Sequence, residues 1–177
     1  MYYFAYGSNL YSRRLAARLD HITPLGTRLL PGYSLRFHKV GWRDQSAKCD
    51  AYQTHHHSDV LYGMLYDIGA QQLPILDAIE GVGQGYEKQE VTLYRLLESA
   101  GLQNVSIAPA ETALTYIANR IDDQLLPYDW YVQHVLQGAI EANFPEHYID
   151  RIRRTPSIPD LDQARASLEW ALHQGVD

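Results

Sequence analysis

The chain opens with an aromatic stretch that runs directly into a tight turn. It reads Tyr2-Tyr3-Phe4-Ala5-Tyr6-Gly7-Ser8-Asn9-Leu10. Helix-forming sequence follows at once, with Ser12 as the N-cap type of residue. The pattern predicts a strand, a short loop and a helix in succession. Gly7 and Asn9 tolerate left-handed or crowded backbone, so the loop could present N–H groups to a carboxylate or an oxyanion. An ordinary strand-to-helix turn is the simpler interpretation of Gly7-Ser8-Asn9 alone.

Composition limits the class of protein. The 177 residues are 46% hydrophobic and 20% charged, as in a folded domain, and we expect one domain over residues 1–177. The net charge of −6 and the lack of a basic run argue against nucleic-acid binding. Arg151, Arg153 and Arg154 are interleaved with acidic residues, which favours a solvated helix face.

The cellular setting follows from cysteine usage and hydropathy. A lone cysteine, Cys49, excludes an intramolecular disulfide framework and suits a reducing compartment. No apolar run approaches the roughly 20 residues that span a bilayer, and no signal-peptide pattern precedes Gly7. We therefore expect a cytoplasmic protein with no membrane partner. The sequence leaves its oligomeric state open.

Strand patterns occupy the first two-thirds of the chain and helix patterns the last third. We expect strands at 2–6, 27–30, 33–39, 60–68, 87–96 and 111–118, and a long polar loop at 41–59 with one candidate strand at 50–53. We expect helices at 12–19, 70–79, 127–142, 145–154 and 160–173. The last helix has an apolar stripe that predicts a buried face, formed by Leu161, Ala164, Leu168, Ala171 and Leu172. This order predicts an α+β fold in which flanking helices pack on a curved sheet or small mixed β-barrel.

A second informative segment covers residues 76–86. Glu80 ends a predicted helix, and Gly81, Gly83 and Gly85 follow it. A carboxylate at a helix C-terminus faces the negative end of the helix dipole, which raises its proton affinity. Such a group suits proton transfer near neutral pH. The alternative is a glutamate that merely ends a surface helix.

Together these segments resemble the γ-glutamylcyclotransferase-like family, also called AIG2-like. The resemblance covers about residues 2–154 and rests on Phe4-Ala5-Tyr6-Gly7-Ser8-Asn9-Leu10, Leu30-Pro31-Gly32-Tyr33, Val60 to Tyr66, Leu76-Asp77 with Glu80-Gly81, Gly85-Tyr86, Tyr131, Gly138-Ala139 and Pro145 with Tyr148-Ile149. The distant pairing of the Tyr-Gly-Ser-Asn loop with Glu-Gly is the specific part, because either motif alone is weak.

The resemblance implies a small mixed barrel and a cyclising enzyme of the acyltransferase or lyase type. It implies that the α-amine of a small γ-glutamyl substrate attacks its own γ-carbonyl and releases 5-oxoproline, a reaction of glutathione metabolism. Glu80 would be the general acid and base. The substrate-binding residues would be Tyr6, Gly7, Ser8, Asn9, Leu10, Tyr86 and Tyr131, with the two last hydroxyls reaching the substrate or Glu80. No cofactor and no metal are implied.

Two alternatives stay open. The leaving group is either an amino acid or an amine, as in a γ-glutamylamine or a γ-glutamyl-capped metabolite. In a different class, the chain is a non-catalytic binding module on the same fold, although such a module needs no carboxylate at Glu80.

Other residues fit chemistry less well. Residues 45–59 depart from the family pattern, and three adjacent histidines, His55 to His57, cannot converge on one metal from an extended strand. A surface loop explains them better. Ser8 lacks a Gly-x-Ser-x-Gly context, and Cys49 lacks features of a reactive thiolate. Asp77 reads as a plain helix-face carboxylate.

Overall fold

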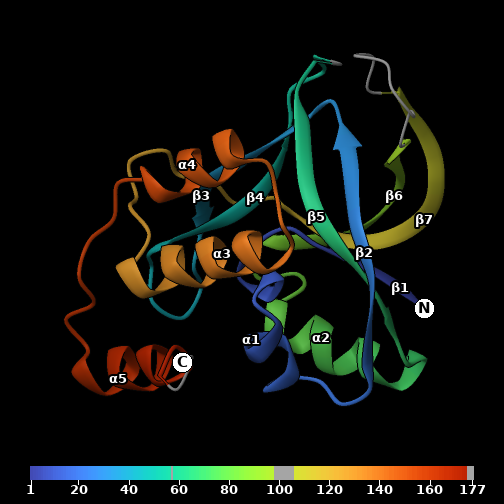
Figure 1. Ribbon diagram of the computed structural model, residues 1–177. Coiled ribbons are helices and arrows are strands. Elements are labelled where there is room, and N and C mark those ends of the chain that lie inside the picture. Colours follow the sequence, from blue (N-terminus) through green and yellow to red (C-terminus); the bar gives the residue numbers. More distant parts are fainter. Residues whose placement is uncertain (57, 98–105, 175–177) are drawn as a thin grey trace.

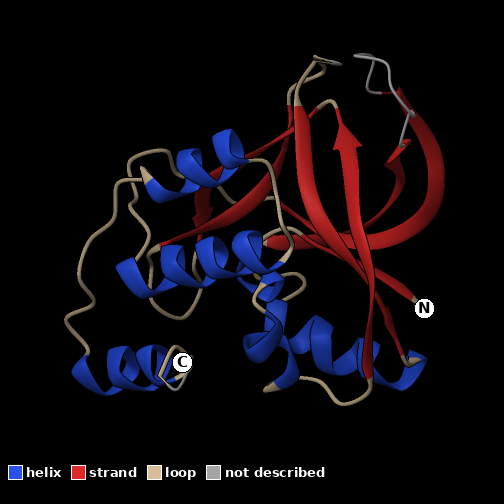
Figure 2. Ribbon diagram, viewed as in Figure 1, coloured by secondary structure: helices blue, strands red, loops and turns tan. Residues whose placement is uncertain are grey.

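Strands dominate the computed structural model, which describes residues 1–56, 58–97 and 106–174. Five of the described strands close into a barrel in the order β1-β5-β2-β6-β7 (Figures 1 and 2). They are β1 (Tyr2–Ala5), β2 (Ile22–Pro31), β5 (Val60–Ile68), β6 (Tyr86–Leu97) and β7 (Ser106–Ala118). β7 closes the barrel against β1 in parallel, and the other neighbours are antiparallel. A separate antiparallel pair consists of β3 (Tyr33–Val40) and β4 (Ala47–Gln53).

Helices flank the barrel on two sides. They are the short turns η1 (Ser8–Leu10) and η2 (Ala70–Gln72) and the helices α1 (Ser12–Ala16), α2 (Leu73–Glu80), α3 (Asp129–Glu141), α4 (Glu146–Arg153) and α5 (Gln163–Ala171). In Figure 1, α3 and α4 lie on the side of β3 and β4, whereas α1 and α2 lie at the lower end of the barrel. No helix in the described residues is long and apolar enough to cross a bilayer.

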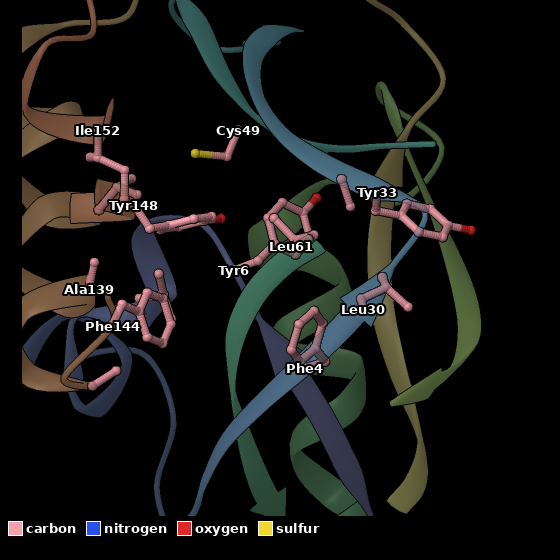
Figure 3. Close-up of a cluster of buried hydrophobic side chains, with 14 of the residues drawn as sticks. Phe4, Tyr6, Leu30, Tyr33, Cys49, Leu61, Ala139, Phe144, Tyr148 and Ile152 are labelled. Carbon is pink, nitrogen blue, oxygen red and sulfur yellow. The ribbon is translucent and has the colours of Figure 1, made fainter. Parts of the chain in front are cut away.

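The main core lies between the barrel and the α3–α4 pair. Figure 3 shows Phe4 and Leu61 on the strands facing Phe144 and Tyr148 on the helical side. Burying each such large side chain is worth roughly 1.5–3 kcal/mol. Close approach at Gly63 belongs to the same packing, because a Cβ there would lie 2.4 Å from the ring of Phe4. The predicted α+β fold with a small mixed barrel and flanking helices is confirmed.

The segment expected to be a long loop with a candidate strand at 50–53 holds a seven-residue strand, β4, which contains that candidate and begins three residues before it. Ala47, Cys49 and Ala51 alternate along its buried face. The polar residue Asp50 is buried as well, because His38 Nε2 lies 2.9 Å from one of its oxygens and the Ala118 N–H donates to the other at 2.8 Å. Partners from distant segments thus satisfy a carboxylate that lies in the middle of a buried strand.

The last helix does not bury the predicted apolar stripe. Leu161 is 86% exposed and Leu168 75% exposed, and none of the residues of α5 is buried. The helix is held by polar groups instead. Glu169 binds Arg14 and lies 2.9 Å from His134 Nε2. The prediction was wrong because α5 attaches through charged residues and through Ala166, whereas Leu161, Ala164, Leu168 and Ala171 of the stripe are exposed.

Candidate active site

The loop after β1 and the end of α2 meet at a small cavity of about 30 Å³. Its walls are formed by Tyr3, Tyr6, Gly7, Ser8, Asn9, Cys49, Glu80, Tyr86, Tyr116 and Tyr131. These residues come from β1, the two residues after it, η1, β4, α2, β6, β7 and α3. A space of this size holds about two water molecules. The closure of the barrel therefore brings six of the seven predicted binding residues, and the predicted catalytic residue, to one place.

Glu80 lies at the wall of this cavity as the last residue of α2. The helix ends there because Gly81 adopts a left-handed conformation with a φ of 72°. The Glu80 side chain is partly buried, and its Oε1 accepts a hydrogen bond of 2.7 Å from Asn9 Nδ2. Burial raises the pKa of Glu80, outweighing the opposite effect of Arg18, Lys39 and Arg14 and of the Asn9 hydrogen bond. The sequence analysis predicted a raised proton affinity for Glu80 and attributed it to the helix dipole. In the structure, desolvation by burial is the largest cause of the raised pKa.

Asn9 is held in one orientation by its neighbours. Arg18 Nη1 donates to Asn9 Oδ1 at 2.8 Å, and an arginine can only donate. The amide nitrogen must therefore face the other way, toward Glu80 and the Tyr3 hydroxyl, which lies 3.1 Å from it. The result is a connected chain from Arg18 through Asn9 to Glu80. The asparagine side chain thus contacts the carboxylate directly, a contact that the loop motif alone did not predict.

The tyrosine hydroxyls are committed to backbone partners. Tyr86 donates to the carbonyl oxygen of Cys49, and the Cys49 N–H donates to the Tyr131 hydroxyl at 3.0 Å. Tyr6 donates to the carbonyl oxygen of Tyr116. Burial raises the pKa of Tyr6, Tyr86 and Tyr131, so all three stay protonated at neutral pH. Within the described residues, neither Tyr86 nor Tyr131 is hydrogen-bonded to Glu80, although both line the cavity beside it.

The loop meets the expectation of crowded backbone at Gly7 and differs from the predicted site at Leu10. Gly7 has a φ of −106° and is not left-handed. Its lack of a side chain matters for packing, because a Cβ there would lie 3.0 Å from the Cys49 Cβ. Leu10 is buried against α3, where its Cβ lies 2.3 Å from the position that a Cβ on Gly138 would take. Leu10 is outside the cavity wall and belongs to the core.

A wider pocket of about 320 Å³ adjoins the cavity. Ser8, Glu80, Tyr86 and Tyr131 line both. The remaining walls are Arg14, Arg18, Lys39, Gly41, Trp42, Arg43, Asp44, Lys48, Ile79, Trp130, Arg165 and Glu169. Six cations and three carboxylates thus line this pocket, in a chain whose net charge is −6.

Sequence reasoning predicted none of these outer residues. Arg14 and Arg18 are four positions apart, a spacing that puts two side chains on one helix face and is the one local signal available. Lys39 and Arg43 belong to no motif and reach the pocket only through the fold. Tyr3 and Tyr116, in the inner cavity, are strand tyrosines like any others in the sequence.

Of the other candidates, Cys49 lines the small cavity, whereas His55, His56 and Asp77 line neither pocket. His55 and His56 are exposed, and His57 lies outside the described residues. Among the residues that the structure describes, no three His, Cys, Asp or Glu side chains are grouped to hold a metal ion. Asp77 accepts hydrogen bonds from the Tyr116 hydroxyl at 2.8 Å and from Lys88 at 2.9 Å, so it braces the wall of the cavity from outside. The Cys49 thiol is buried, and burial raises its pKa.

Solved structures share this fold over nearly the whole chain. A protein named gamma-glutamyl cyclotransferase superposes with a TM-score of 0.79 at 20% identity, covering 99% of both chains. The uncharacterized protein loc79017 from Homo sapiens gives 0.74 at 20% identity, covering 95% of this chain and 96% of its own. YkqA from Bacillus subtilis gives 0.66 at 23% identity, covering 89% of this chain and 56% of its own. No curated protein matches the chain in sequence.

Family membership rests on the sequence itself. The sequence model of the AIG2-like family matches residues 60–152, which is more than half of the chain and includes Glu80, Tyr86 and Tyr131. The solved structures agree with this match in fold. The chain belongs to the AIG2-like family.

Proposed function

We propose that this protein is a γ-glutamylcyclotransferase that releases 5-oxoproline from a small γ-glutamyl compound, with Glu80 as general acid and base. One observation carries the proposal. A partly buried carboxylate with a raised pKa lies where the small cavity joins the larger pocket, and Asn9 holds it there. A group of this kind is suited to take up and return protons near neutral pH.

The proposed reaction needs only the substrate. The α-nitrogen of the γ-glutamyl group bonds to the γ-carbonyl carbon and closes a five-membered ring, and the bond from that carbon to the departing nitrogen breaks. The attacking nitrogen begins as an ammonium and ends as a lactam N–H, so it loses two protons. The departing nitrogen gains two and leaves as an ammonium. Ring closure within one molecule supplies the proximity advantage, so no protein nucleophile is required.

Glu80 would relay these protons from one nitrogen to the other. Positioned acid–base catalysis of this kind typically contributes about 10²–10⁴ in rate. Gly7 and Ser8 line the same cavity as Glu80, and the first N–H groups of a helical turn lack acceptors within that turn. We assign them to the substrate carboxylate or the tetrahedral oxyanion, a contribution of comparable size. Tyr86 and Tyr131 would shape the wall around the reacting carbon.

The test is product formation with a panel of γ-glutamyl amino acids and γ-glutamylamines, followed as 5-oxoproline by mass spectrometry. We expect Glu80→Gln to lower kcat by about 10²–10⁴ without changing the thermal unfolding curve. Glu87→Gln is the matched control, because Glu87 is an exposed glutamate that also accepts a hydrogen bond from an asparagine, Asn119. Unchanged turnover in Glu80→Gln would remove Glu80 from the mechanism. If the wild-type protein forms no 5-oxoproline from any member, a non-catalytic binding module becomes the better assignment.

A further inference from the structure

Positive charge in the larger pocket exceeds what the protein neutralises. Three of its six cations have carboxylate partners, since Arg14 pairs with Glu169, Lys48 with Asp44, and Arg165 with Asp160. The other three, Arg18, Lys39 and Arg43, have no carboxylate within 4 Å in the described part of the chain. They line the pocket together with its one remaining carboxylate in the described residues, Glu80, and Arg18 and Lys39 act on its charge.

Lys39 is the most unusual of the three. It lies at the end of β3 with only 2% of its surface exposed, and its Nζ lies 4.3 Å from the centroid of the Tyr86 ring. Burial lowers the pKa of Lys39 to about 8, an effect that the nearby Glu80 carboxylate opposes. A buried ammonium without an anionic partner is unfavourable unless a ligand supplies one.

Arg18 and Arg43 complete the group. Arg18 is half-buried and donates to the Asn9 amide, a neutral acceptor that leaves its charge uncompensated. Arg43 is exposed and lies over the ring of Trp42, with its Cζ 4.6 Å from the ring centroid. The three cations therefore extend from the Asn9–Glu80 contact, past the buried Lys39, to the exposed edge of the pocket.

A count of charges identifies the kind of ligand. Three unpaired cations and an ionised Glu80 leave a surplus of two positive charges. A γ-glutamyl group carries one ammonium and one carboxylate at its α-carbon, so its net charge is zero. The surplus can be matched only by the part of the substrate beyond the γ-carbonyl.

We propose that the larger pocket is a subsite for a leaving group with two negative charges, and that Lys39 is its specificity-determining residue. This inference rests on the proposed function, because it takes Glu80 as the boundary between the γ-glutamyl group and the leaving group. The ligand class is a γ-glutamyl conjugate of an amine bearing two anionic charges. An acidic amino acid and a phosphate-bearing amine both satisfy this chemistry.

The decisive probes are γ-glutamylglutamate and γ-glutamylglutamine, which have nearly the same size and differ by one negative charge. Binding is measured by titration calorimetry to the Glu80→Gln protein, in which turnover is suppressed. We expect γ-glutamylglutamate to bind about 10-fold to 100-fold more tightly, since a charge-assisted hydrogen bond to a buried group is worth that much. The preference should shrink as salt is added. The affinities of γ-glutamylphosphoethanolamine and γ-glutamylethanolamine are compared in the same way. This second comparison shows whether a phosphate can supply the negative charge in place of two carboxylates.

Lys39 is tested by substitution in the same background. Lys39→Met keeps the length of the side chain and should abolish the preference, whereas Lys39→Arg should retain most of it. Arg154→Met is the matched control, because it removes one cation from a side chain that is 82% exposed, directly after α4. If Lys39→Met does not fold, Arg43→Gln should reduce the preference, and the comparison of the two probes on Glu80→Gln still decides the question.

The outcomes separate this inference from the proposed function. Equal binding of the two probes overturns the subsite, whether or not the wild-type protein releases 5-oxoproline. A preference for the dianionic probe that survives in Lys39→Met refutes the role of Lys39. A Lys39-dependent preference without any 5-oxoproline supports the anionic subsite and refutes the cyclotransferase reaction.

Discussion

Replacing Asn9 by alanine tests the arrangement around Glu80 most directly. Asn9 Nδ2 donates to Glu80 at 2.7 Å, and its Oδ1 is held by Arg18 at 2.8 Å. The substitution removes a hydrogen bond that favours the ionised carboxylate. It also breaks the link between the carboxylate and Arg18. The expected effect is a further rise in the pKa of Glu80, because its charged form loses a partner.

The size of the effect follows from the type of hydrogen bond. A hydrogen bond to a charged group contributes about 1.5–3 kcal/mol, and each 1.4 kcal/mol is a factor of ten. We therefore expect kcat/KM of Asn9→Ala near neutral pH to fall about 10-fold to 100-fold. Glu80 must be ionised to accept a proton, so a raised pKa moves the acidic limb of the pH–rate profile to higher pH.

The assay is the pH dependence of 5-oxoproline release by wild type and Asn9→Ala, with thermal unfolding measured on the same samples. Asn119→Ala is the matched control. Its side chain donates to Glu87 at 2.8 Å, the same pair of groups at an exposed position. This control should leave both kcat/KM and the profile unchanged. An Asn9→Ala protein with a wild-type profile, in a chain where Glu80→Gln is inactive, would refute the claim that Asn9 holds the carboxylate.

Two further predictions concern stability. Gly138→Ala places a Cβ 2.3 Å from the Leu10 Cβ. We therefore expect the free energy of unfolding to fall by about 1–3 kcal/mol and the melting temperature to fall with it, despite the better helix propensity of alanine. An unchanged melting temperature would contradict this packing. Burial lowers the pKa of His134 to about 4, so the folded protein keeps a neutral imidazole while the unfolded chain titrates near 6.5. Urea unfolding should therefore show stability falling from about pH 6.5 toward pH 4, and less steeply in His134→Gln. Burial raises the pKa of Glu169, but His134 and Arg14 outweigh it and lower that pKa to about 2, so the stability that this carboxylate contributes is lost only as the pH falls below about 4.5. An equal slope of stability against pH in wild type and His134→Gln would exclude His134 as the cause of the loss above that pH.

Local patterns were enough to predict the strand, loop and helix at the start of the chain. They also predicted the helix that ends at Glu80, where glycines follow in the sequence. In the structure the first of these, Gly81, is left-handed and ends the helix. Local patterns predicted only the second part of β4, as the candidate strand at 50–53, and took the residues before it for a loop. The partners that make Asp50 tolerable lie 12 and 68 residues away, at His38 and Ala118, and no local pattern contains them.

The candidate site was likewise predicted only in part. The resemblance named the inner residues, and the fold gathers all of them except Leu10 around one cavity, while their catalytic and binding roles stay predictions. The outer cations could not be predicted, because Lys39 and Arg43 become neighbours of Glu80 only when β3 and the residues after it fold against the barrel. The C-terminal helix shows the opposite error. A regular apolar stripe with Leu168 at its centre predicted burial, yet the contacts of Glu169 decided which side of α5 faces the protein.

The tyrosine hydroxyls of the inner cavity have a consequence for ligand affinity. Tyr6, Tyr86 and Tyr131 bind main-chain groups on β7 and β4, and in doing so they join β1, β6 and α3 to those strands. The side chains are therefore immobilised before any substrate arrives. Little conformational entropy remains to be lost by the protein on association, so the entropic penalty falls mainly on the ligand. In such a rigid receptor, flexible γ-glutamyl compounds should gain affinity when their own rotations are restricted to the bound geometry.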